Sequence, residues 1–308
     1  MIWDELIAAY LFLAGVGAGA FALGALVRLT KVDAPAASLA GCVLGPAAVM
    51  VGILLLVFDA RAGLMNPLRF FGLVANLQSV MAWGVLILCA FVVASGLALL
   101  LTLMKRRVPA ALDVVGIVLA LCVAGYTGVL LGDAQVAFPL WSMVVLPPLF
   151  AVSAASTGFA AVALATQVTA SDQARRLKVA RKAGLVLPVV EAVLVAALLL
   201  VTSGTTGAAA AAAQATVSNL ISGAFAPAFW VGLVAIGLLM PVALSLAEMR
   251  GASSPAASGA GAGAGATAEA PAGRARALAL AEKACVLVGG FMLRYLVVMA
   301  AIPVTFAG

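Results

Sequence analysis

The sequence predicts an all-α integral membrane protein with eight transmembrane helices. Of its 308 residues, 66% are hydrophobic and only 9% are charged, whereas a soluble domain carries about 25% charged residues. The apolar residues fall in runs close to the ~20 residues that cross the hydrocarbon core of a bilayer. The basic residues between these runs also sort to one side of the predicted membrane. No run alternates as barrel strands do, so helices are expected to satisfy the backbone.

The predicted helices follow one another with short polar connections between them. They cover residues 6–27, 39–58, 77–104, 112–131, 144–166, 184–202, 229–246 and 281–302. The first contains the pair Gly15 and Gly19, a spacing that lets another helix approach closely. A short surface helix is plausible within 203–227. Residues 251–273 are mostly Ala, Gly, Ser and Pro, which is typical of a flexible linker.

The basic residues support this helix count independently. With eight helices, 14 of the 17 Lys and Arg residues lie in the connections after the first, third, fifth and seventh, counting Lys283 at the very start of the eighth. Arg61 and Arg69 lie on the opposite side, and Arg294 lies inside the eighth helix. By the positive-inside rule the 14 are cytoplasmic, so both termini and the connection 59–76 face outward. The net charge of +6 therefore reflects topology, and we expect no nucleic acid partner.

The residue types limit the cofactors that this protein is able to hold. There is no histidine, which removes bis-histidine haem and histidine-ligated zinc. The four cysteines, Cys42, Cys89, Cys122 and Cys285, stand singly in apolar runs. No pair has the spacing of an iron–sulfur or zinc site. We expect neither haem nor metal in this chain.

Two ionisable residues stand out because they lie well inside predicted membrane helices, Glu191 in the sixth and Arg294 in the eighth. Charges there cost a few kcal/mol at least, so each is a functional candidate. They could belong to a proton path, together with Asp133 on the outer side. Alternatively, they pair only to fix helix packing.

Polar and aromatic residues gather at the outer ends of the first four helices. The candidates for binding a quinone head are Tyr126, Asp59, Arg61, Gln78, Ser79, Trp83 and Tyr10. Together they offer hydrogen-bonding groups, an aromatic wall and a route to water. Each has a simpler explanation: Trp83 and Tyr10 could be interfacial aromatics, and Gln78 or Ser79 could cap the third helix.

Several stretches resemble the polysulfide reductase membrane-subunit family, also called NrfD/PsrC. They are IWDELIAAYLFLAGVGAGAF, FDARAGLMNPLRFF with SVMAWGVLIL, YTGVLLG before PLWSMVVLPPLF, SAASTG and GGFMLRYLVVMA. The resemblance implies two four-helix bundles, here 1–140, with an outer-face quinone site, and 141–308, which includes the linker. It also implies Tyr126 at the quinone head and the Asp59–Arg61 corner beneath an iron–sulfur partner.

By this resemblance, the chain is expected to be a quinone-interacting anchor in the bacterial cytoplasmic membrane. It would pass electrons between menaquinone or ubiquinone and an iron–sulfur subunit, which serves a molybdopterin catalytic subunit on the outer face. The chain would not be catalytic on its own, and its other contacts would be membrane lipid. A secondary transporter is the alternative from another class, favoured by a midplane Glu191–Arg294 pair. A purely structural anchor is a third.

Overall fold

The architecture is helical throughout the part of the chain that the computed structural model describes, residues 5–59, 78–174, 178–252 and 269–304. The long helices are α1 (Glu5–Leu29), α2 (Pro35–Asp59), α5 (Val80–Leu103), α6 (Ala110–Gly132), α7 (Leu146–Thr169), α9 (Lys178–Ser203), the π-helix η2 (Ala228–Leu239) continued by α11 (Met240–Ala252), and α12 (Glu269–Met299). The short ones are α8 (Ser171–Ala174), η1 (Gly207–Ala209) and α10 (Ala210–Ile221). The all-α prediction is confirmed.

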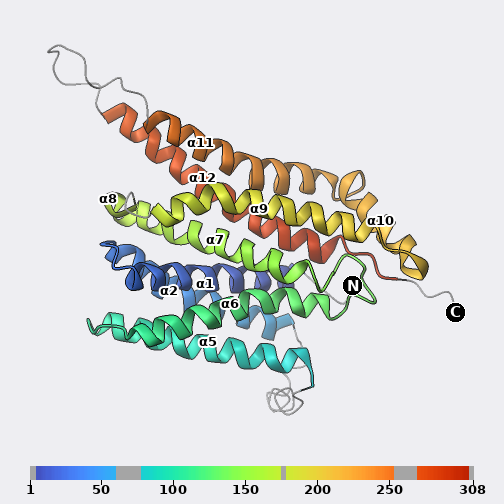
Figure 1. The fold of residues 1–308 in the computed structure, drawn as a ribbon, viewed down its shortest axis with the longest axis horizontal. Helices are drawn as coiled ribbons and strands as arrows, with labels where there is room; N and C mark the ends of the chain where they lie inside the picture. The colour runs from blue at the N-terminus through green and yellow to red at the C-terminus, as the bar shows by residue number, and fades with distance from the viewer. Residues whose placement is uncertain (1–4, 60–77, 175–177, 253–268, 305–308) are drawn as a thin grey trace.

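The long helices run side by side along one axis (Figure 1). Within the described residues, seven stretches are long and apolar enough to cross a membrane, and they match the first seven predicted helices. The eighth predicted helix lies in α12, whose 31 residues include charged side chains in the first half. The chain is a multi-pass membrane protein, while eight crossings stay a prediction.

The outward surface of the helices is apolar, as a lipid environment requires. Val93 on α5 and Leu200 on α9 expose 70% and 71% of their surface. Such side chains would be costly in water but are at home in hydrocarbon, which is as apolar as leucine itself. Membrane lipid is therefore the natural neighbour of this surface.

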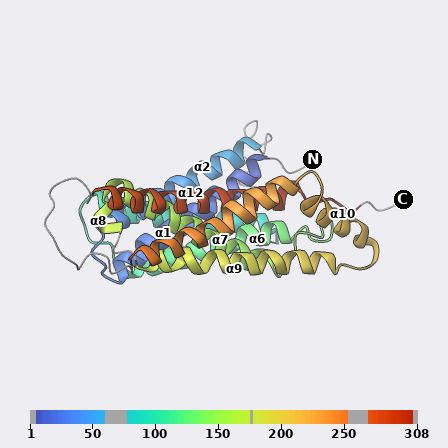
Figure 2. The ribbon, with the colours of Figure 1, turned by 90° about the horizontal axis from the view of Figure 1, so that it is seen from above.

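The helices have two chemically different ends, with α8 at one and α10 at the other (Figure 2). The end that carries Arg28, Lys31 and residues 105–107 is called the basic end. Lys31 and Lys105 have φ of 53° and 55°, the left-handed conformation that commonly terminates helices. The opposite end, where α1 begins and α12 ends, is called the terminal end. The positive-inside rule puts the basic end in the cytoplasm, and this orientation stays a prediction.

The first group of helices, α1, α2, α5 and α6, is tied together at the basic end by Arg28. Its Nε donates to both carboxylate oxygens of Asp113 on α6, at 3.0 and 3.1 Å. Its Nη1 donates to Ser38 and Cys42 on α2, at 3.1 and 2.7 Å, and Cys42 contacts Thr102 of α5. The guanidinium of Arg28 therefore links α1 directly to α2 and α6, and Cys42 extends the contact to α5.

Helix α1 also contacts the second group, which comprises α7, α9, η2–α11 and α12. A Cβ at Gly19 would collide with the backbone of Ala154 on α7, and one at Gly158 would collide with the backbone of Gly19. A Cβ at Gly17 would lie 2.6 Å from the carbonyl oxygen of Gly45 on α2. The predicted close approach at Gly19 is confirmed, because only glycine lets these backbones meet.

The connections differ in detail from the predictions. The short helix expected within 203–227 is α10. The linker expected over 251–273 is shorter, because 251–252 end α11 and 269–273 begin α12. Its middle, 253–268, lies outside the described residues. The π-helical geometry of η2 was not expected, and such geometry is frequent at functional sites.

Candidate functional site

Tyr10 and Tyr126 lie near each other toward the terminal end of the first group. Tyr10 comes from α1 with 1% of its surface exposed, and Tyr126 comes from α6 with 8% exposed. The two phenols lie close enough to interact electrostatically. Asp133, the exposed residue that follows α6, interacts with Tyr126 in the same way. The structure thus brings together three residues that the sequence had assigned to this side.

The position of Tyr126 depends on Gly84 of α5. A Cβ at Gly84 would overlap the ring carbon Cζ and the hydroxyl of Tyr126. Gly52 of α2 has a similar relation to Tyr10, whose ring carbon Cδ2 would lie 3.3 Å from a Cβ there. Both phenols therefore lie against glycine surfaces on neighbouring helices. Sequence reasoning missed these glycines, although the aromatic-glycine step Trp83–Gly84 was a weak signal.

The predicted residues at the start of α5 are on the surface. Trp83 is 54% exposed and Gln78 is exposed. Ser79 is the N-cap residue of α5, but its side chain makes no capping hydrogen bond. Its carbonyl instead accepts from the amide of Ala82 at 3.1 Å. Trp83 directly precedes Gly84, which lies against Tyr126, so this end of α5 is next to the Tyr126 region.

Asp59 and Arg61 are the other predicted members of the quinone site. Asp59 is the last residue of α2, which places it at the terminal end. Its side chain is not among those that the structure describes, and Arg61 lies outside the described residues. Their roles stay predictions.

Arg294 of α12 is fully buried between the two groups. Its hydrogen bonds go to oxygen atoms, namely the carbonyls of Leu11 and Gly290 at 3.1 and 2.9 Å and the Ser153 hydroxyl at 2.9 Å. The ring of Phe150 lies 5.3 Å from the guanidinium carbon. Gly15 makes room for it, because a Cβ there would lie 2.5 Å from Nη2.

Glu191 of α9 is 5% exposed and faces Ser153, Ser156 and Arg294. Among the described residues, no ion pair within 4 Å joins its carboxylate to Arg294. Its Oε1 and the Nη2 of Arg294 are the buried side-chain atoms there without a hydrogen-bond partner. Each unsatisfied group costs about 1–3 kcal/mol, and buried polar groups of this kind are commonly bridged by water.

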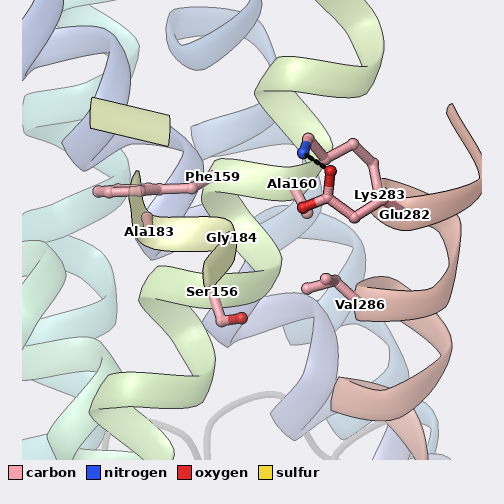
Figure 3. A pocket seen from close by; sticks show the side chains of 8 residues that line it. All are labelled: Ser156, Phe159, Ala160, Ala183, Gly184, Glu282, Lys283 and Val286. Carbon is pink, nitrogen blue, oxygen red and sulfur yellow. Dashed lines mark hydrogen bonds and ion pairs between the residues drawn. The ribbon is translucent and has the colours of Figure 1, made fainter. Parts of the chain in front are cut away.

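A second buried carboxylate, Glu282 of α12, lies nearer the basic end and was missed by sequence reasoning. Figure 3 shows it paired with the neighbouring Lys283 beside a small cavity. Its Oε1 accepts a hydrogen bond from Ser245 of α11 at 2.8 Å. The only available signal was its position near the start of the eighth predicted helix.

Comparison with known proteins places this chain in a family. The profile described as "Polysulphide reductase, NrfD" matches residues 1–257. The chain belongs to the NrfD polysulfide reductase family. The polysulfide reductase C subunit of Wolinella succinogenes is 32% identical over 278 residues, which are 82% of this chain and 85% of that protein. The NrfD homolog of Haemophilus influenzae is 30% identical, over 79% of this chain and 82% of its own.

Escherichia coli NrfD is 29% identical over 83% of this chain and 88% of its own length. In this NrfD family protein, both Tyr10 and Tyr126 lie within the residues that the family profile matches. Helix α12, with Glu282 and Arg294, follows those residues.

Proposed function

We propose that this chain is the quinone-reactive membrane subunit of a multisubunit oxidoreductase. The observation that carries the proposal is the placement of two phenols, Tyr10 and Tyr126, against Gly52 and Gly84 near the terminal end of the first group, with Asp133 close enough to interact with Tyr126. The name of the Wolinella relative, which is one lettered component of a polysulfide reductase, supports an assembly with further subunits. The partners are an iron–sulfur subunit and a molybdopterin catalytic subunit.

The two phenols suit the chemistry of a quinone head. A phenol donates a hydrogen bond to a quinone carbonyl and accepts one from a quinol hydroxyl. The cavity beside Glu282 and the apolar cavity between α9, η2 and α12 both lie in the second group, away from Tyr126. We infer that the head binds from the lipid-facing side, because the exposed ring of Trp83 directly precedes Gly84, which lies against Tyr126. Menaquinone and ubiquinone both meet these requirements.

Oxidation of a quinol releases two protons and two electrons, and the site offers a route for each. Asp133 is exposed beyond the end of α6, so its carboxylate can take protons from the Tyr126 region to water. The electrons pass to the iron–sulfur subunit at the terminal end, where Gln78, Asp59 and Arg61 would border it. By the positive-inside rule, this end faces outward from the bacterial cytoplasmic membrane.

The variant Tyr126→Phe tests the proposal in the assembled complex. Losing one hydrogen bond of about 1 kcal/mol net corresponds to about fivefold slower quinol-linked turnover. Activity of the catalytic subunit with an artificial dye should be unchanged. Tyr295→Phe is the matched control, because Tyr295 lies on α12 stacked on Phe291. Wild-type quinol kinetics in an assembled Tyr126→Phe complex would remove the main support for the site.

A further inference from the structure

A small cavity lies in the second group, toward its basic end (Figure 3). Its lining comes from α7, α9 and α12 and consists of Ser156, Phe159, Ala160, Ala183, Gly184, Glu282, Lys283 and Val286. It has room for about one water molecule. In Figure 3 Glu282 and Lys283 border it on one side and Ser156 on another. Carboxylate, ammonium and hydroxyl groups therefore share one enclosed space.

The residues around the cavity bind the Glu282 carboxylate and leave space for it. Only 1% of Glu282 is exposed, yet Ser245 and Lys283 both bind it. A Cβ at Gly184 would lie 2.5 Å from its Oε1, so glycine keeps this space open. Pro188 of α9 has no N–H to bond the carbonyl of Gly184. That carbonyl lacks its usual helical donor beside the cavity.

Ser156 connects the cavity to Glu191. Its side chain lines the cavity and also faces the Glu191 carboxylate. Ser153, one turn earlier on α7, faces the same carboxylate and binds Arg294. The unpartnered atoms, Oε1 of Glu191 and Nη2 of Arg294, lie at this inner end. The polar groups therefore form a series from Glu282 to Arg294.

The series covers a large part of the membrane. Glu282 and Arg294 are twelve residues apart on one helix, which corresponds to about 18 Å at the rise of an α-helix. The hydrocarbon core is about 30 Å thick. Elsewhere in the second group, the other described cavity is lined by apolar residues alone.

We propose that the second group holds a proton path that opens at the basic end through Glu282 and ends at Glu191 beside Arg294. The Glu282 carboxylate first takes a proton from cytoplasmic water past Lys283. The proton then moves to a water in the cavity, passes by the Ser156 hydroxyl and protonates Glu191, which leaves Glu282 ionised again. No electron moves in these steps. Arg294 stays charged and stabilises the ionised form of Glu191.

The path does not depend on the quinone site, and infrared spectroscopy of the purified full-length protein in lipid tests it without quinone or partner subunits. In acidic buffer, the carbonyl stretch of a protonated carboxyl shifts when water is exchanged for D₂O. Glu191→Gln should remove the band of Glu191. In the wild type this band should exchange rapidly after the D₂O switch.

Glu282→Gln and Ser156→Ala should each slow the exchange of the Glu191 band at least tenfold. Glu282→Asp keeps a carboxylate and should restore much of the rate. Ser95→Ala, which removes a buried hydroxyl in the first group, is the matched control and should leave the rate unchanged. Ser156→Ala removes a single oxygen atom, so it keeps the test open if Glu282→Gln fails to fold.

Exchange at the wild-type rate in either folded variant, Glu282→Gln or Ser156→Ala, would overturn the path. So would an exchanging carboxyl signal in Glu191→Gln that is as large as in the wild type, because Glu191 would then carry no exchanging proton. The quinone proposal would stand in both cases, because it depends on the separate kinetics of Tyr126→Phe.

Discussion

Replacing Gly84 by alanine tests whether function requires the present position of Tyr126. The added Cβ would overlap the Cζ and hydroxyl of Tyr126. Because carbon atoms in contact stay about 3.5–4.0 Å apart, the ring must shift by roughly 1–2 Å. The extra methyl group itself costs about 1–3 kcal/mol of stability in a packed core. The substitution therefore perturbs the site without touching a polar group.

The expected loss follows from hydrogen-bond geometry. A hydroxyl bond works at about 2.5–3.0 Å between oxygens, so a shift of more than 1 Å breaks it. The bond alone accounts for about fivefold in rate, whereas a misplaced reacting group can cost about 100-fold. We expect quinol-linked turnover of Gly84→Ala to fall by about tenfold to 100-fold, while dye-linked activity of the complex stays constant.

Two glycines provide matched controls. Gly96 on the same helix and Gly125 beside Tyr126 have no atom within 4 Å of an added Cβ, so Gly96→Ala and Gly125→Ala should keep wild-type kinetics. In the double variant Gly84→Ala/Tyr126→Phe the two losses should not add, since both act on one side chain. If assembled Gly84→Ala and Gly96→Ala complexes oxidise quinol equally fast, the reasoning is refuted.

Three further predictions concern stability, topology and cofactors. Asp113→Ala leaves the largely buried Arg28 without its carboxylate partner and should cost about 3–5 kcal/mol, seen as a lower Tm of the purified protein. Asp172→Ala at an exposed position should change the Tm little, and equal Tm values for the two variants would contradict the role of the ion pair. In a cysteine-free background in intact cells, a membrane-impermeant thiol reagent should label Val144→Cys at the terminal end but not Arg106→Cys at the basic end. The reverse pattern would show that the predicted topology is wrong. The purified protein should show no stoichiometric Soret band, because it contains no histidine, and such a band would refute the cofactor prediction.

Hydropathy was sufficient to predict the course of the helices, because crossing a bilayer imposes both length and composition on each one. The first helix was expected over 6–27 and is α1, Glu5–Leu29. The π-helical geometry of η2 was not accessible in this way. At Gly237, η2 lies so close to Gly289 of α12 that a Cβ would reach its Cα at 2.5 Å, and such a contact depends on tertiary structure.

The candidate sites were predictable only in part, for the same reason. The positions of Tyr10, Tyr126 and Asp133 near the outer ends of predicted helices were enough to group these three residues. The importance of Gly84 arises from a ring on another helix, which no local pattern contains. Glu282 lay near the start of a predicted helix, where a charge needs no special explanation. Its burial became visible only when α9 and α11 were in place.

The bond between Arg294 and the carbonyl of Leu11 has a consequence for how the two halves of the protein communicate. Leu11 follows Tyr10 directly on α1, so one turn of backbone supports both the phenol and the buried guanidinium. If a ligand beside Tyr10 changes the proton affinity of Glu191 through this turn, protonation of Glu191 must change the ligand's affinity by the same factor. Such reciprocity would make quinone occupancy and proton loading a thermodynamic cycle, in which measuring either coupling determines the other.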